Sequence, residues 1–228
     1  MIGDTPSNTS DGRLIVVNAE AVELKGILNV PQNAKGLVIL ACGVDDTVPH
    51  QRAISHASTF YSGGLATLIV DLFTGEEQAL DKETGYFRLN TEVMQQRISA
   101  MSNWLLEQPE TQHFTLGYFG SGTSGAAALI AAAERPDVVA AVVSAGGRVD
   151  LVRDALSRHH ITAATLLIAA EKDEAAVKLN TEMLELLTAR KKFEKIPGAS
   201  SLYEERRVQD EVSRLALEWF TDWLPSAA

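Results

Sequence analysis

Apolar residues recur along the chain in two patterns, which alternate from near the start to the end. Short, mainly apolar runs are typical of strands that are covered on both faces of a sheet. They occupy residues 37–41, 66–72, 114–119, 138–143, 164–169 and 192–196. Stretches with helical spacing lie between or after them, at residues 51–61, 89–107, 151–156, 174–189 and around 208–223. This alternation predicts a mostly parallel sheet with helices on both faces.

The N-terminal part of the chain has a different pattern. Residues 14–18 and 22–30 read as two strands joined at Ala19-Glu20, which predicts an antiparallel hairpin and brings the expected sheet to eight strands. The first dozen residues are rich in Asp, Ser, Thr, Gly and Pro. We therefore expect a loosely attached leader over residues 1–12 and a single α/β domain over residues 13–228.

A turn of small residues follows the run at 114–119, and an alanine-rich helical stretch follows the turn at once. The turn reads Gly120-Ser121-Gly122-Thr123-Ser124. Strand, tight turn and helix are the context of a G-x-S-x-G elbow, whose central residue exposes a nucleophile at the top of a sheet. The central residue here is Gly122, so the pattern predicts the backbone of an elbow without its usual nucleophile.

Composition and charge exclude some function classes. The formal net charge is -10 and the sequence pI is near 5.0, which gives the long-range field the wrong sign for nonspecific attraction to nucleic acid or to an anionic membrane. No apolar run approaches the ~20 residues that cross a bilayer. A single cysteine excludes an internal disulfide, and the first residues lack the pattern of a secretory signal. We expect a cytoplasmic protein whose partners are small molecules or proteins.

Several local sequences are fairly specific in combination. They are Leu37-Val-Ile-Leu-Ala-Cys-Gly43, Gly64-Leu-Ala-Thr-Leu-Ile-Val-Asp-Leu72, Gly117-Tyr-Phe-Gly120, Ala140-Ala-Val-Val-Ser-Ala-Gly-Gly-Arg148 and Pro197-Gly-Ala-Ser-Ser-Leu-Tyr-Glu205. In this order and at these intervals they resemble the α/β-hydrolase fold, in its dienelactone-hydrolase-like branch of small esterases and lactonases. The resemblance covers residues 13–224 and implies a nucleophile, an acid and a histidine in that chain order.

Two of the three positions that the resemblance implies are substituted. Asp173 matches the family's acid, but Gly122 stands at the nucleophile position and Ser201 at the position of the histidine. Cys42 lies where relatives often have a histidine. A serine hydroxyl without an adjacent base is a poor nucleophile near neutral pH. The resemblance therefore implies a pseudoenzyme or a non-standard small-molecule-binding protein.

An active ester or lactone hydrolase is the alternative. Ser124 could serve as nucleophile if the elbow slid by two residues, but the stronger interpretation is that Ser121, Thr123 and Ser124 cap the helix. Cys42 could be a thiolate if a nearby helix N-terminus lowered its pKa, with His50 or His56 as base. It could also be a small buried apolar residue. A third possibility is a structural partner of an active paralogue.

The expected pocket lies at the carboxyl ends of the strands, where open α/β sheets bind their ligands. Backbone amides near Val44 and Thr123 could hold an anion, so we expect a carboxylate-, carbonyl- or phosphate-bearing ligand. No metal or cofactor is expected, because the acidic clusters at 45–46 and 171–174 lack the spacing of a metal site. Residues 73–88 form a long connection, either a lid or a plain crossover. The predicted pocket residues are Cys42, Gly43, Val44, Gly122, Thr123, Asp173 and Ser201.

Overall fold

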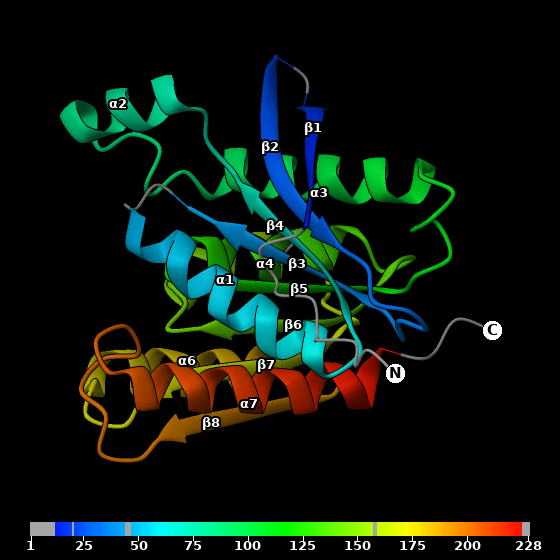
Figure 1. Cartoon of the computed structure of the whole chain (residues 1–228). Helices are drawn as coiled ribbons and strands as arrows, with labels where there is room; N and C mark the ends of the chain where they lie inside the picture. The colour runs from blue at the N-terminus through cyan, green and yellow to red at the C-terminus, as the bar shows by residue number, and fades with distance from the viewer. Residues whose placement is uncertain (1–11, 20, 44–46, 157–158, 225–228) are drawn as a thin grey trace.

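Eight strands form one sheet, as the sequence predicts (Figure 1). The computed structural model describes residues 12–19, 21–43, 47–156 and 159–224, and of residues 47–50 and 156 it describes only the backbone. The sheet order is β1-β2-β4-β3-β5-β6-β7-β8. The strands are β1 (Arg13–Ala19), β2 (Val22–Asn29), β3 (Leu37–Cys42), β4 (Ala66–Asp71), β5 (Leu116–Ser121), β6 (Val139–Ala145), β7 (Ala164–Ala170) and β8 (Lys191–Ile196).

Only the N-terminal hairpin departs from the parallel arrangement. β1 pairs antiparallel with β2, and β2 pairs antiparallel with β4. The remaining neighbours in the sheet, β4-β3-β5-β6-β7-β8, all pair parallel. Every residue of β3 and of β7 is buried, while β1 alternates buried and exposed positions. The difference follows from cover, because a central strand is packed by helices on both faces and an edge strand is not.

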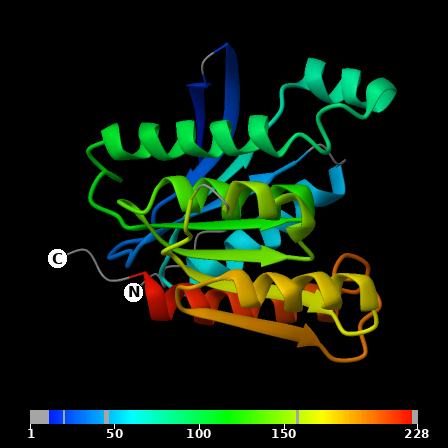
Figure 2. The same cartoon turned by 180° about the vertical axis from the view of Figure 1, so that it is seen from behind.

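Helices cover both faces of the sheet. α1 and α7 lie on one face, in front in Figure 1, and α3, α4 and α6 lie on the other, in front in Figure 2. The helices are α1 (Thr47–Ser62), α2 (Gly75–Thr84), α3 (Thr91–Glu107), α4 (Thr123–Glu134), the short turns η2 (Val149–Leu151) and α5 (Arg153–Leu156), α6 (Glu174–Leu186) and α7 (Arg206–Trp223). α1 begins before the predicted residue 51, and α6 ends before the predicted residue 189.

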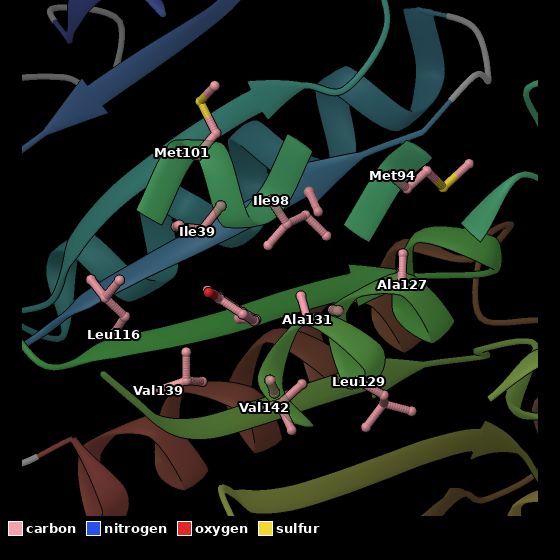
Figure 3. Packing of buried hydrophobic residues seen from close by; sticks show 14 of the residues in the cluster. Ile39, Met94, Ile98, Met101, Leu116, Ala127, Leu129, Ala131, Val139 and Val142 are labelled. Carbon is pink, nitrogen blue, oxygen red and sulfur yellow. The ribbon is translucent and has the colours of Figure 1, made fainter. Parts of the chain in front are cut away.

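The core beneath α3 and α4 holds the elbow close to the sheet. Ile98 and Met101 of α3 pack with Ala127 and Ala131 of α4 in one buried cluster, part of which Figure 3 shows. The small alanines let α4 approach β5 closely. A Cβ added at Gly120 would lie 2.5 Å from the backbone oxygen of Ser124, so only glycine fits where strand and helix meet.

The connection at residues 73–88 contains a helix that the sequence prediction missed. Thr74 and Glu77 form a reciprocal capping box at the start of α2, and Gly85 ends the helix in the left-handed conformation with φ 67°. α2 projects from the body of the molecule (Figures 1 and 2). Its first turn is fastened to α3, where the guanidinium of Arg97 binds the Glu77 carboxylate at 2.6 Å and 2.7 Å.

The division into a leader and a single domain stays a prediction, since residues 1–11 lie outside the described residues. Within the part of the chain that the structure describes, no helix is both long and apolar enough to cross a membrane.

Candidate functional site

Gly122 lies in the tight turn between β5 and α4. Its backbone has φ 57° and ψ -128°, a conformation that residues with a side chain rarely adopt. Its N–H donates to the carbonyl of Ala145 at 3.3 Å, and its own carbonyl accepts from the N–H of Arg148 at 3.1 Å. These two bonds fix the turn against the end of β6. The sharp strand-to-helix turn predicted from the sequence is therefore present, with Gly122 at its apex.

A pocket of about 430 Å³ lies over this turn. Three predicted pocket residues line it, namely Gly43, Gly122 and Thr123. A Cβ added at Gly122 would have the Tyr203 hydroxyl, at 3.9 Å, as its nearest neighbour, so the space above the glycine is open. The described residues that line the pocket are Gly43, Arg52, Arg88, Met94, Ser121, Gly122, Thr123, Ser124, Gly146, Arg148 and Tyr203.

Arg88 reaches the pocket from the loop between α2 and α3. Its Nε donates to the Oδ2 atom of Asp81 at 2.9 Å, and its backbone N–H donates to Oδ1 at 2.9 Å. The Phe87 N–H donates to the same Oδ1 at 2.7 Å. Burial acts to raise the pKa of the fully buried Asp81 carboxyl, but the hydrogen bonds from Arg88 and Phe87 outweigh it and lower that pKa. Asp81 is thus an ionised anchor that orients Arg88.

Arg148 enters the pocket from the loop after β6. It makes a bidentate ion pair with Asp150, with Nε–Oδ1 at 2.9 Å and Nη2–Oδ2 at 2.7 Å. The hydrogen bond from Arg148 is the main cause of a lowered pKa at Asp150. Because the Arg148 N–H also binds the Gly122 carbonyl, this arginine is tied directly to the elbow.

Arg52 of α1 is the third cation of the pocket. Its guanidinium carbon lies 4.9 Å from the centroid of the Tyr203 ring, which is a cation–π distance. Among the described residues no carboxylate forms an ion pair with it. The Tyr203 hydroxyl lies within hydrogen-bonding distance of the carbonyls of Ala145, at 3.3 Å, and Gly146, at 3.4 Å. The stacked pair therefore forms one wall of the pocket.

A smaller cavity of about 40 Å³ lies behind this wall. Arg52 and Tyr203 line both spaces, whereas Cys42 and His56 line only the inner one. Burial, and next the carboxylate of Asp71, raise the pKa of the Cys42 thiol far above its usual range. The expectation that a helix N-terminus lowers this pKa is wrong, because the sulfur is buried and faces a negative charge.

Of the two histidines considered as a base for Cys42, the structure describes the side chain of His56 only. Burial, assisted by the charge of Arg52, lowers the pKa of His56 to about 4, and its Nδ1 lies 2.6 Å from Ser213 Oγ on α7. His56 is therefore neutral at pH 7 and joins two helices. The side chain of His50 lies outside the described residues, as does the predicted pocket residue Val44.

Ser124 lies in the first turn of α4 and is buried. Its Oγ is 2.9 Å from the carbonyl of Ala41 and 2.9 Å from that of Ser121, and it accepts from the Ser121 N–H at 3.2 Å. The hydroxyl thus ties α4 to β3 and β5. The expected side-chain cap on α4 is absent among the described contacts, since the cap residue is Gly122 itself.

Asp173 and Ser201 lie on neighbouring loops after β7 and β8. These loops are joined by the hydrogen bond from the Lys172 N–H to the Ala199 carbonyl, at 2.9 Å. The Asp173 carboxylate accepts from the Ala176 N–H at 3.0 Å and caps α6, and Ser201 Oγ accepts from the Tyr203 N–H at 3.1 Å. Neither residue is among those that line the two spaces near the elbow.

Sequence reasoning missed the most distinctive residues of the pocket, which are Arg52, Arg88, Arg148 and Tyr203. One of them carried a usable signal. Arg148 follows Gly146-Gly147 directly after β6, at the carboxyl edge of the sheet where ligands of α/β folds bind. Arg52 and Arg88 lie in a helix and in a long connection, where nothing local distinguishes them from surface cations.

Comparison with known proteins agrees with the fold. The model of the dienelactone hydrolase family matches residues 24–199. A dienelactone hydrolase from Anabaena variabilis is 39% identical, with a TM-score of 0.86 over 94% of this chain and 98% of that one. Est1E from Butyrivibrio proteoclasticus shares only 15% identity and shows the fold alone, with a TM-score of 0.72 over 92% of this chain and 100% of that one.

Two Mycobacterium tuberculosis proteins, from strains H37Rv and CDC 1551, are 35% identical over 210 residues and are named as candidate phosphoribosyl transferases. The match takes in 92% of this chain but 46% of each relative, so the chain spans about half the length of the curated relatives it matches. The family model and the Anabaena structure both extend over most of the chain. The chain belongs to the dienelactone hydrolase family.

Proposed function

We propose that this chain binds a small molecule in the pocket over the elbow and does not hydrolyse esters through a serine–histidine pair. The observation that carries the proposal is the apex of the elbow. Gly122 has the backbone conformation of that turn, with φ 57°, and no side chain that could attack an acyl carbon. In this proposal Gly122 stands at the nucleophile position of the family, Ser201 at the histidine position and Asp173 at the acid position.

The contacts of the other candidate nucleophiles support the same proposal. Ser124 Oγ is occupied by backbone groups of Ala41 and Ser121. The raised pKa of Cys42 keeps its thiol protonated, and a thiol is a far weaker nucleophile than a thiolate. His56, the imidazole that shares the inner cavity with Cys42, bonds to Ser213. Each candidate thus lacks the activated partner that covalent catalysis needs.

The chemistry of the pocket favours an anionic ligand. Arg52, Arg88 and Arg148 line it, and it lies at the N-terminus of α4, where the helix dipole attracts negative charge. A ligand with a carboxylate or a phosphate group therefore suits it better than a neutral carbonyl compound. Phosphoribosyl transfer is not part of this proposal, because the relatives with that name are about twice as long as this chain.

Covalent labelling tests the proposal. The purified protein is incubated near neutral pH with a fluorophosphonate and, separately, with iodoacetamide, and adducts are read by intact mass and peptide mapping. We expect no fast phosphonylation at Ser124 or Ser201 and slow alkylation of Cys42. The Ser124→Ala and Cys42→Ala variants are the matched controls. Rapid stoichiometric labelling that disappears in one of them, together with loss of ester turnover, would establish the hydrolase alternative instead.

A further inference from the structure

The pocket over the elbow is a cationic site in an acidic protein. The chain has 20 lysines and arginines against 30 aspartates and glutamates. Among the described residues that line the pocket, three are arginines and none is an aspartate or a glutamate. The carboxylates that orient Arg88 and Arg148, those of Asp81 and Asp150, are not among the lining residues. The positive groups therefore line the pocket, and the carboxylates paired with two of them do not.

We infer that the anion bound here is the phosphate group of a phosphate monoester, held jointly by Arg52, Arg88 and Arg148. This inference rests on the proposed function and specifies the class of ligand. The three guanidinium groups come from α1, from the α2–α3 loop and from the loop after β6, so they approach the pocket from three separate elements.

Contacts with other residues of the chain orient each guanidinium before any ligand enters. Arg88 uses Nε and Nη2 on Asp81, and Arg148 uses Nε and Nη2 on Asp150, which leaves Nη1 of both without a hydrogen-bond partner among the described atoms. Arg52 is stacked on Tyr203. Oriented donors lose less conformational entropy when they bind an oxyanion than freely moving side chains do.

The number of arginines distinguishes a phosphate from a carboxylate. One guanidinium in a bidentate pair already matches the two oxygens and the single charge of a carboxylate. A phosphate monoester offers three terminal oxygens in a tetrahedral arrangement and about -1.5 to -2 charges at pH 7. Three guanidinium groups from separate elements match that arrangement, and Arg52, which has no carboxylate partner among the described residues, adds a positive charge that is not already compensated.

The glycine at the elbow fits the same ligand. With no side chain at Gly122, an anion can approach the first N–H groups of α4, a helix of 12 residues that begins at Thr123. The same substitution that removes a nucleophile thus opens the backbone at the helix N-terminus. In this arrangement Gly122 and the three arginines serve one purpose, the binding of a phosphate group.

Isothermal titration calorimetry with three probes tests the inference. Phenyl phosphate, benzoate and phenol share a ring and differ in the group attached to it. We expect phenyl phosphate to bind at least tenfold more tightly than benzoate and phenol not to bind. Each of Arg52→Gln, Arg88→Gln and Arg148→Gln should weaken phenyl phosphate about tenfold or more, the loss expected for one charge-assisted hydrogen bond. Arg190→Gln should change the affinity for phenyl phosphate by less than about twofold.

Arg190 is the matched control, because it precedes β8 at the amino edge of the sheet and stacks on Trp223. Arg52→Gln breaks no described ion pair, so it keeps the test valid if loss of the Asp81 or Asp150 pair impairs folding. Absent or arginine-independent binding of phenyl phosphate would overturn the phosphate inference. Equal or tighter arginine-dependent binding of benzoate would also overturn it while leaving the proposed binding function intact. Fast fluorophosphonate labelling would instead remove the proposed function itself.

Discussion

At the scale of the residue, Gly122 determines what the elbow can do. A side chain at this position has space, since the nearest atom to an added Cβ would be 3.9 Å away, but the backbone there has φ 57°. Such a conformation costs about 1–3 kcal/mol for a residue other than glycine, and hydrolases of this fold accept that cost in order to expose a nucleophile. Glycine adopts this conformation without that cost, and Gly122 carries no side chain that could act as a nucleophile.

Replacing Gly122 by serine should therefore lower stability without creating an efficient esterase. We expect a loss of about 1–3 kcal/mol in the free energy of unfolding, from the strain at positive φ. We expect no burst of product with p-nitrophenyl acetate, because no imidazole is found among the described residues of the pocket. Urea unfolding and stopped-flow absorbance measure the two effects. A stoichiometric burst in Gly122→Ser, absent from Gly122→Ala, would show that a base reaches the elbow.

At the scale of the element, most helices and strands follow from the apolar pattern, and the misses have local causes. α2 was missed because its residues are mostly polar and it buries little, so hydrophobic periodicity gives no signal. Its capping box, Thr74 with Glu77, and its terminal Gly85 were nevertheless visible in the sequence. Polar caps predict such a projecting helix better than apolar spacing does.

The attachment of α2 can be tested at Glu77, whose side chain both caps the helix and binds Arg97. Burial acts to raise the pKa of this carboxyl, but hydrogen bonds from Arg97 and Thr74 lower it. Glu77→Gln should keep the cap, because glutamine also completes a capping box, but lose the ionic part of the Arg97 contact. We expect amide hydrogen exchange in residues 75–84 to rise modestly in Glu77→Gln and strongly in Glu77→Ala. Equal exchange in both variants and the wild type would contradict this expectation.

A second element-scale prediction concerns His56, which joins α1 to α7 through Ser213. Its folded pKa of about 4 lies below the ordinary value of 6.5. Between these values the unfolded chain binds more protons than the folded one, so stability falls as the pH is lowered from about 6.5 to 4. The shift corresponds to a loss of roughly 3 kcal/mol.

The measurement is the free energy of unfolding of the wild type and of His56→Gln across pH 4 to 7. Carboxylates titrate in both proteins, so the difference between the two free energies of unfolding isolates the contribution of the histidine. We expect that difference to shrink as the pH falls through this window, because only the wild type loses the contribution of a neutral imidazole. A difference independent of pH would mean that His56 titrates normally in the folded protein.

At the scale of the whole molecule, the sequence located the site better than it identified its chemistry. The elbow at Gly122 and the glycine at 43 were predicted to frame a pocket at the carboxyl edge of the sheet, and both line it. The three arginines could not be found in this way, because their convergence depends on how α1 and two loops fold over that edge. A net charge of -10 also gives no indication of the three arginines that line the pocket.

The expected places of Asp173 and Ser201 illustrate the same limit. Motif spacing assigned both to the pocket, yet neither lines it, since each side chain is engaged in a local turn. Short polar side chains such as those of Asp173 and Ser201 readily hydrogen-bond to nearby backbone groups, and here they do so instead of entering the pocket. Which residues at the carboxyl edge of the sheet reach the pocket is decided by packing across the whole fold, which local motif spacing does not reveal.

Taken as a whole, we propose, the molecule keeps the hydrolase architecture without an activated nucleophile. Intact mass after incubation with a fluorophosphonate, with ester turnover followed in the same samples, reports on this directly. We predict an unmodified mass and no turnover above that of the Ser124→Ala control. Rapid, stoichiometric phosphonylation of the folded protein, accompanied by turnover that the adduct abolishes, would show instead that an activated serine is present.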